Sequence, residues 1–190
     1  MAAARWTMAD VNRWNRDEFV ARLGFLFEQS PWVAEAAWGD RPFDDRETLH
    51  RALTAVATGA GEERQVALIR AHPDLVGRAA LAGTLTREST GEQQAAGLDA
   101  GRLTREEIAR FGELNESYKT RFGFPFVICA RENTKATILA GFATRLGHSR
   151  DQEIATALAE IARICWFRLA DAVAEEPRTT SDIGGTTAHS

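Results

Sequence analysis

The dipeptide His72-Pro73 is the first place in this sequence where side chains could do chemistry. It follows residues 61–71, in which apolar residues recur at helical spacing. Proline has no N–H and pushes the residue before it toward extended geometry, so the helix should end at His72 with its backbone held at a bend. Histidine exchanges protons near neutral pH. His72 is therefore a candidate for proton transfer, whereas the ordinary place of a lone histidine is a surface or a helix end.

The polar segment TRESTGEQ, residues 86–93, is a second candidate. Ser89 and Glu92 have the spacing of a capping box, which predicts a helix that begins between Thr86 and Ser89. A well-capped helix is the simpler interpretation. The functional interpretation is a carboxylate site at the positive end of the helix dipole, where Gln93 could add amide hydrogen bonds to a polar ligand.

The segment FGFPFVICAR, residues 122–131, is a third candidate. Gly123 and Pro125 interrupt helical hydrogen bonding, so the backbone groups around them need other partners. Burial in the core is the usual role of such an apolar run. A flat heterocycle with amide edges is the alternative partner for its backbone.

Arg168 is the fourth candidate, because it lies inside the apolar stretch ICWFRLADAV. A buried guanidinium needs an anion. A nearby Asp or Glu is the usual answer, and a substrate carboxylate is the alternative.

Composition and motif content argue against several other classes of protein. The formal net charge of −4 offers no basic field for nucleic acid or an acidic membrane. No apolar run approaches the roughly 18 residues of a membrane span. The motifs of serine hydrolases, P-loop proteins, dinucleotide-binding folds and zinc helices are missing from the sequence, and its four histidines lack metal-ligand spacing. We therefore expect no metal and no organic cofactor.

Cysteine usage and the N-terminal residues bear on the compartment. Cys129 and Cys165 lie in apolar stretches, which is typical of small core residues rather than of a disulfide or a metal pair. The opening MAAARWTMAD lacks the apolar run of a signal peptide. The chain is therefore expected to be reduced and cytoplasmic.

Helix signals dominate the elements that must position these candidates. Helices are predicted at residues 30–38, 44–59, 61–71, 104–123, 134–147 and 149–176. The predicted caps are Ser30 before Pro31, Asp44 with Glu47, Thr104 with Glu107 and Ser149 with Gln152, and the predicted glycine stops are Gly59 and Gly123.

Only FPFVICA, residues 124–130, resembles a strand, and a lone strand cannot form a sheet, so we expect an extended segment buried between helices. Residues 74–90 read as a loop with room for one short helix. The fold prediction is an all-α, single-domain bundle of about seven or eight helices over residues 5–175. Residues 176–190 are predicted to be a disordered polar tail.

Taken together, these motifs resemble one family. HPDLVGRAALAGTLTRESTGEQQAAGLD followed by LNESYKTRFGFPFVICAR is similar to the decarboxylases of 2-oxo-4-hydroxy-4-carboxy-5-ureidoimidazoline (OHCU) in urate degradation. The resemblance extends from SPWVAEAAWGDRPF through ARICWFRLADAV, with the H-P-D-L, S-x-x-E-Q and F-G-F-P-F elements in order. It implies an all-helical, often homodimeric carboxy-lyase that needs no metal or organic cofactor and yields (S)-allantoin and carbon dioxide.

The resemblance also implies the site. His72 and Glu92 would be the catalytic residues. The late-helix arginine of the family maps to Arg168, with Arg163 as the rival position. The implied substrate contacts are Pro73, Ser89, Thr90, Gly91, Glu92, Gln93, Phe124, Pro125, Phe126, Val127, Ile128 and Arg168. The peroxisomal ending of eukaryotic members is missing here, which fits the cytoplasmic expectation.

The expected chemistry follows from the substrate. Its carboxylate sits on a ring carbon beside a C=N bond that can take the electron pair, so the protein must orient the carboxylate, stabilise the anion and deliver a proton to one face. We expect His72 to donate that proton and Glu92 to accept a hydrogen bond from the hydroxyl or ureido group. Arg168 and the helix start at Ser89 are rival anchors for the anion. Two alternatives remain: another ureido or imidazoline acid as substrate, and a non-catalytic helical adaptor with His72 and Glu92 exposed and apart.

Overall fold

The computed structural model describes residues 5–99 and 101–175, and this part of the chain is all-α. It has ten α-helices, three short 3-10 helices and no strand beyond an isolated bridge between Trp6 and Val173. The helices are α1 Met8–Arg13, α2 Arg16–Leu23, α3 Trp32–Ala37, α4 Arg46–Gly59, α5 Glu62–Ala71, α6 Arg78–Leu81, α7 Arg87–Ala95, α8 Arg105–Phe122, α9 Lys135–Arg145 and α10 Arg150–Ala172, with η1 Gly24–Leu26, η2 Trp38–Asp40 and η3 Ala130–Glu132.

The predicted fold class is confirmed. Three of the ten helices have six residues or fewer, namely α1, α3 and α6, so the number of longer helices agrees with the predicted seven or eight. The short α6 lies in the predicted loop 74–90. Residues 1–4, 100 and the predicted tail 176–190 lie outside the described part of the chain.

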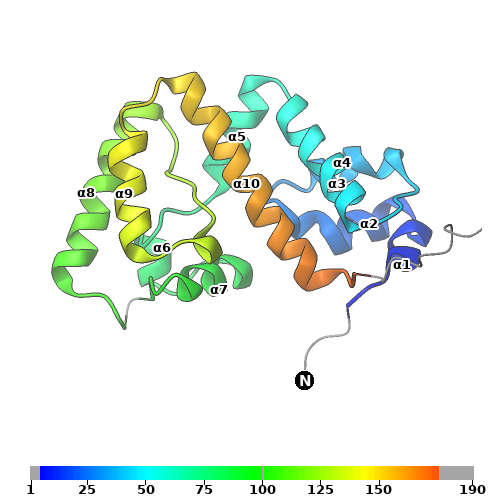
Figure 1. The fold of residues 1–190 in the computed structure, drawn as a ribbon, viewed down its shortest axis with the longest axis horizontal. Helices are drawn as coiled ribbons and strands as arrows, with labels where there is room; N and C mark the ends of the chain where they lie inside the picture. The colour runs from blue at the N-terminus through cyan, green and yellow to red at the C-terminus, as the bar shows by residue number, and fades with distance from the viewer. Residues whose placement is uncertain (1–4, 100, 176–190) are drawn as a thin grey trace, which may run out of the picture.

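Helix α10 is the central element of the domain. Figure 1 shows it crossing the middle of the molecule, with α1–α4 on one side and α6–α9 on the other. It packs against α4 and α5. One apolar cluster runs from Met8 to Val173, so both sides share a single core. The two ends of the described chain meet where Trp6 N–H donates to the carbonyl of Ala172, over 2.9 Å.

Most helix ends follow from local hydrogen bonding. The capping boxes of Thr104 with Glu107 and of Ser149 with Gln152 are confirmed. Gly123 ends α8 in the left-handed region at φ 79°, where a glycine has no steric penalty. These boundaries were predictable because each depends on residues within one helical turn.

Two predicted N-caps were wrong by one residue. Helix α3 begins at Trp32, with Pro31 rather than Ser30 in the N-cap position. The cap of α4 is Asp45, whose carboxylate accepts from Thr48 N–H over 2.8 Å, because a threonine hydroxyl can return the bond as well as a glutamate can. The predicted end of α4 at Gly59 is confirmed. Sequence reasoning also missed α1 and α2, although both begin with capping boxes.

The extended segment after α8 is confirmed, and protein side chains satisfy part of its backbone. Arg70 Nε donates to the carbonyl of Gly123 over 2.8 Å, and Arg145 Nη1 donates to that of Val127 over 2.7 Å. Cys129 N–H donates to a carboxylate oxygen of Glu160 over 2.8 Å. Helices α5, α9 and α10 therefore each hold this segment by one side chain.

A buried ion pair supports the middle of the extended segment. Arg145 Nε donates to Glu153 over 2.8 Å, and Nη2 of the same arginine also contacts this carboxylate. Glu153 is fully buried, and it also accepts from the Tyr118 hydroxyl and contacts His148 Nδ1 over 2.8 Å. Burial raises the pKa of the Tyr118 hydroxyl, which therefore stays protonated and acts as a donor. The arginine that holds the Val127 carbonyl is thus itself fixed by a carboxylate.

Removing that carboxylate should destabilise the whole domain. Glu153→Ala leaves Arg145 buried without its ion-pair partner, which typically costs about 3–5 kcal/mol. Urea unfolding of the variant measures the loss. The control is Glu113→Ala, which breaks an exposed pair with Arg110 and should leave the free energy of unfolding nearly unchanged. Equal effects of the two substitutions would contradict the structural role of Glu153.

Candidate active site

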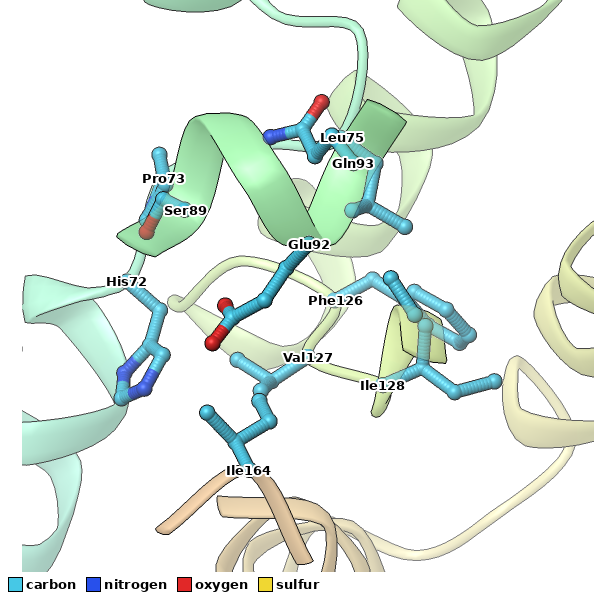
Figure 2. Close-up of a pocket in the computed structure, with 11 residues that line it drawn as sticks. His72, Pro73, Leu75, Ser89, Glu92, Gln93, Phe126, Val127, Ile128 and Ile164 are labelled. Carbon is cyan, nitrogen blue, oxygen red and sulfur yellow. The ribbon is translucent and has the colours of Figure 1, made fainter. Parts of the chain in front are cut away.

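A hollow opens between the end of α5, helix α7, the extended segment and α10 (Figure 2). Its cavity volume is about 30 Å³, and Figure 2 shows the His72 ring and the Glu92 carboxylate facing into the same region. The residues of the sequence prediction that line it are His72, Pro73, Ser89, Glu92, Gln93, Phe126, Val127 and Ile128. Segments more than fifty residues apart in the chain therefore meet around one hollow.

Five other predicted substrate contacts do not line this hollow. Phe124 and Pro125 are buried at the start of the extended segment, where Phe124 stacks on Phe122. The Thr90 hydroxyl donates to the carbonyl of Thr86, over 2.9 Å. Gly91 and Arg168 line a separate groove beside Phe25. A direct contact between any of these five residues and a substrate stays a prediction.

Three apolar residues complete the wall, and sequence reasoning did not select them. They are Leu75, Ala130 and Ile164. No local signal distinguishes them from ordinary core residues, because each is an apolar side chain in an apolar neighbourhood. Only the packing of α10 against the extended segment makes Ile164 part of this wall.

His72 occupies the predicted bend and is nearly buried, with 7% of its surface exposed. It is the C-cap of α5, with extended backbone angles φ −75° and ψ 139°. Nδ1 lies 3.0 Å from the carbonyl oxygen of Leu68, so the ring carries its hydrogen on Nδ1. Nε2 is buried and has no hydrogen-bond partner within the described residues. The ring therefore presents a bare lone pair.

The environment of His72 keeps its ring neutral. Burial lowers the pKa of His72 to about 4; the hydrogen bond to Leu68 opposes this shift, the charge of Arg168 adds to it and that of Glu28 opposes it. At neutral pH the resting ring accepts a proton at Nε2 and has none to donate there. The expected role of proton donor therefore requires that His72 first take a proton up.

Helix α7 begins within the predicted interval, but Ser89 is not its cap. Thr86 is the N-cap, and its hydroxyl accepts from Ser89 N–H over 3.2 Å. The prediction that Ser89 and Glu92 form a capping box was wrong, because the helix already begins at the Thr86 cap, which accepts from the N–H of Ser89. The Ser89 hydroxyl is free to turn inward, where it donates to Glu28 over 3.1 Å.

Glu92 is held by a two-pronged contact with Arg168. Arg168 Nε donates to one carboxylate oxygen over 2.7 Å and Nη2 to the other over 3.0 Å. Burial would lower the pKa of Arg168, but its hydrogen bonds and the charges of Glu92 and Glu28 raise it above its usual value. The rival Arg163 is exposed and pairs with Glu160 over 3.1 Å. A carboxylate of the protein is thus the anion that Arg168 requires, as in the simpler interpretation.

Glu28 is the polar residue of this region that sequence reasoning missed. Only 4% of it is exposed, and its carboxylate accepts from Arg168 Nη2 and from the Ser89 hydroxyl, each over 3.1 Å. The signal was available in the stretch GFLFEQSP, in which one charge follows an apolar run. Arg168 was selected on the same ground, as a charged residue inside an apolar stretch.

Gln93 supports the loop after Pro73. Its carbonyl oxygen accepts from Val76 N–H over 3.0 Å, and its amide lies 3.5 Å from the carbonyl of Asp74. Val76 has a positive φ of 53°, which is strained for a β-branched residue, so this loop needs the support. The amide of Gln93 therefore already has protein partners.

Two negative findings concern the described residues alone. Residues 5–99 and 101–175 contain no group of three or more His, Cys, Asp or Glu side chains arranged to hold a metal ion. No helix in the same ranges is both long and apolar enough to span a bilayer. Cys129 and Cys165 are free and buried as expected, and burial raises the pKa of the Cys129 thiol to about 11.

The buried ring of His72 should make stability depend on pH. Between pH 6.5 and about 4 the unfolded chain binds a proton at this residue and the folded chain does not, so stability falls as the pH falls through this window and is unaffected above it. Unfolding free energies of the protein and of His72→Asn, measured from pH 7 to 4.5, should differ by an amount that shrinks on acidification. Parallel profiles would contradict a depressed pKa, and an NMR titration of His72 checks it directly.

Comparisons with known proteins identify the family of this chain. The OHCU decarboxylase family model matches residues 12–170. A 2-oxo-4-hydroxy-4-carboxy-5-ureidoimidazoline decarboxylase of Amia calva is 43% identical over 169 residues, which are 87% of this chain and 94% of that protein. The protein of the same name from Haloferax volcanii is 40% identical over 90% of this chain and 98% of its own length.

Solved structures share the fold. A crystal structure of (S)-allantoin synthase matches with a TM-score of 0.69 and 29% identity over 88% of this chain, which spans about half (54%) of that chain. A crystal structure of OHCU decarboxylase in the presence of (S)-allantoin matches with a TM-score of 0.61 and 21% identity, over 81% of this chain and 95% of that one, and this match bears on the fold alone. From the family match and the full-length relatives together, the chain belongs to the OHCU decarboxylase family.

Proposed function

We propose that this chain decarboxylates OHCU to (S)-allantoin in urate catabolism, and that the reaction takes place in the hollow between His72 and Glu92. Relatives that align with most of this chain are named OHCU decarboxylases. His72 and Glu92 line the same hollow. The observation that carries the proposal is the bare, buried Nε2 of His72 in the hollow that Glu92 also lines.

The substrate can accept the electron pair that carbon dioxide leaves behind. As carbon dioxide leaves, its bonding pair forms a double bond between the two ring carbons, the electrons of the C=N bond move to the ring nitrogen, and that nitrogen takes a proton from water. The product of that step is an enol. It becomes allantoin when the hydroxyl loses its proton and the adjacent carbon, which bears the ureido group, gains one. The protein must manage this transfer from oxygen to carbon on one face.

A neutral His72 suits that transfer. Its Nε2 lone pair can accept the hydroxyl proton, and the resulting imidazolium can return the proton to carbon. The hydrogen bond from Nδ1 to Leu68 holds the ring in one tautomer and one direction. Delivery from a fixed ring reaches only one face of the planar enol, which accounts for a single enantiomer.

Glu92 and the extended segment orient the substrate in this proposal. Two N–H groups of Arg168 fix the Glu92 carboxylate, and its remaining lone pairs can accept hydrogen bonds from the ureido and hydroxyl groups. Within the described residues, the N–H groups of Val127 and Ile128 have no acceptor, so they can donate to carbonyl oxygens of the ring. The side chains of Phe126 and Ile164 add an apolar wall.

The adaptor alternative is contradicted by the burial of the two side chains. It required His72 and Glu92 to be exposed and apart, whereas His72 is buried and the Glu92 side chain is only 13% exposed, and both line one hollow. Nothing in the wall favours another ureido or imidazoline acid over OHCU.

Assembly and location are further parts of the proposal. We infer a homodimer from the family resemblance, and a cytoplasmic location from the two buried cysteines, which are free thiols. Sedimentation of the purified protein tests the first inference, and imaging of a tagged protein tests the second.

His72→Asn should lower turnover by about 10²–10⁴-fold, because a positioned acid–base group typically supplies that much. OHCU decays spontaneously to racemic allantoin, so optical purity is the informative readout. A circular dichroism time course that starts from urate with the two preceding enzymes measures it. His50→Asn is the control, since His50 contacts the carbonyl of Ala162 on α10 and does not line the hollow, and it should stay within a few-fold of the parent. Formation of (S)-allantoin at the parent rate by folded His72→Asn would remove histidine from the mechanism.

A further inference from the structure

Arg168 contacts two carboxylates, although one carboxylate would be enough to neutralise its charge. Its Nε and Nη2 contact Glu92, and Nη2 also contacts Glu28 over 3.1 Å. Only 3% of the Arg168 side chain and 4% of the Glu28 side chain are exposed. One guanidinium and two carboxylates give this group, here called the Arg168 cluster, a net negative charge.

Among the described residues that line the hollow, none carries a positive charge that would compensate that of the cluster. His72 is neutral at its working pH. The groove that Glu92 and Arg168 also line includes Arg87 and Arg131, of which Arg131 pairs with Asp171. Within the described residues no lysine or arginine lines the hollow. A substrate that carries a carboxylate therefore enters a site whose fixed charge is negative.

Glu28 does not line the hollow, so it acts on a substrate through its neighbours. It lies in the turn after η1, where the carbonyl of Phe25 also accepts from Arg168 Nη1, over 3.1 Å. Its carboxylate accepts from Nη2 of Arg168, the same nitrogen that also donates to Glu92. Without Glu28, Arg168 would keep its contacts to Glu92, and the net charge of the Arg168 cluster would be zero instead of negative.

We propose that Glu28 is a charge-setting and positioning residue, which offsets Arg168 so that the arginine orients Glu92 without binding the substrate carboxylate tightly. This inference rests on the proposed decarboxylation. An enzyme gains rate only from interactions that are stronger in the transition state than in the bound substrate. A strong ion pair to the leaving carboxylate would stabilise the substrate before carbon dioxide departs. Glu28 prevents that ion pair, because its negative charge offsets the positive charge of Arg168.

Glu28→Gln separates charge from shape. Glutamine keeps an acceptor for the Ser89 hydroxyl and for Arg168 Nη2, but it removes one negative charge. Calorimetry measures how the lost charge changes binding affinity, independently of activity. The two ligands are hydantoin-5-acetate, a stable anionic ring compound, and neutral (S)-allantoin. We expect the anion to bind roughly tenfold more tightly to the variant, as a Coulomb interaction across a partly buried site allows, while allantoin affinity stays within about twofold.

Kinetics give a second readout. For OHCU the variant should show both a lower KM and a lower kcat, which is the signature of a substrate bound too favourably before reaction. Ser89→Ala is the matched control, because it removes a hydrogen bond to Glu28 and leaves every charge in place. It should not tighten the binding of hydantoin-5-acetate.

The inference is overturned if folded Glu28→Gln binds the anion no more tightly than the parent, or if allantoin affinity rises equally. Should the variant not fold, the parent protein supplies the test: salt screens repulsion, so affinity for hydantoin-5-acetate should rise with ionic strength, and a fall overturns the inference. Failure of the proposed function is distinct, since the parent protein would then form no (S)-allantoin from OHCU.

Discussion

The burial of Arg168 is the constraint on which the rest of the site depends. A guanidinium inside a protein needs anions at fixed positions, and here they come from the turn after η1 and from α7. Satisfying one residue of α10 thereby places Glu92 beside the hollow and turns Ser89 inward. The orientation of the acidic group in the site is thus a consequence of the charge balance of the core.

The imidazole is governed by the opposite condition. His72 has no acidic partner for its ring, and burial keeps it uncharged, so a residue that is partly protonated near neutral pH in water is a proton acceptor in the fold. The sequence indicated the bend at His72 correctly, because Pro73 explains it. It could not indicate the protonation state, which depends on how much protein surrounds the ring.

The extended segment shows a similar division. Gly123 and Pro125 predict that the chain leaves the helix there, and the structure agrees. The partners of the freed backbone are side chains from three helices, including Arg145, which is itself bound by Glu153. The segment is therefore rigid where it borders the hollow, which leaves the N–H groups of Val127 and Ile128 in fixed directions.

Helix class, most helix ends and the position of the histidine follow from short stretches of sequence, because capping and proline sterics act within about one turn. The family motifs added Glu92 and Arg168 as members of one site. The missing information was which charges meet: Arg168 and Glu28 are 140 positions apart, and their pairing depends on how α10 crosses the domain. Desolvation and Coulomb energies depend on such three-dimensional distances, so the neutral ring and the negative cluster became evident in the folded chain alone.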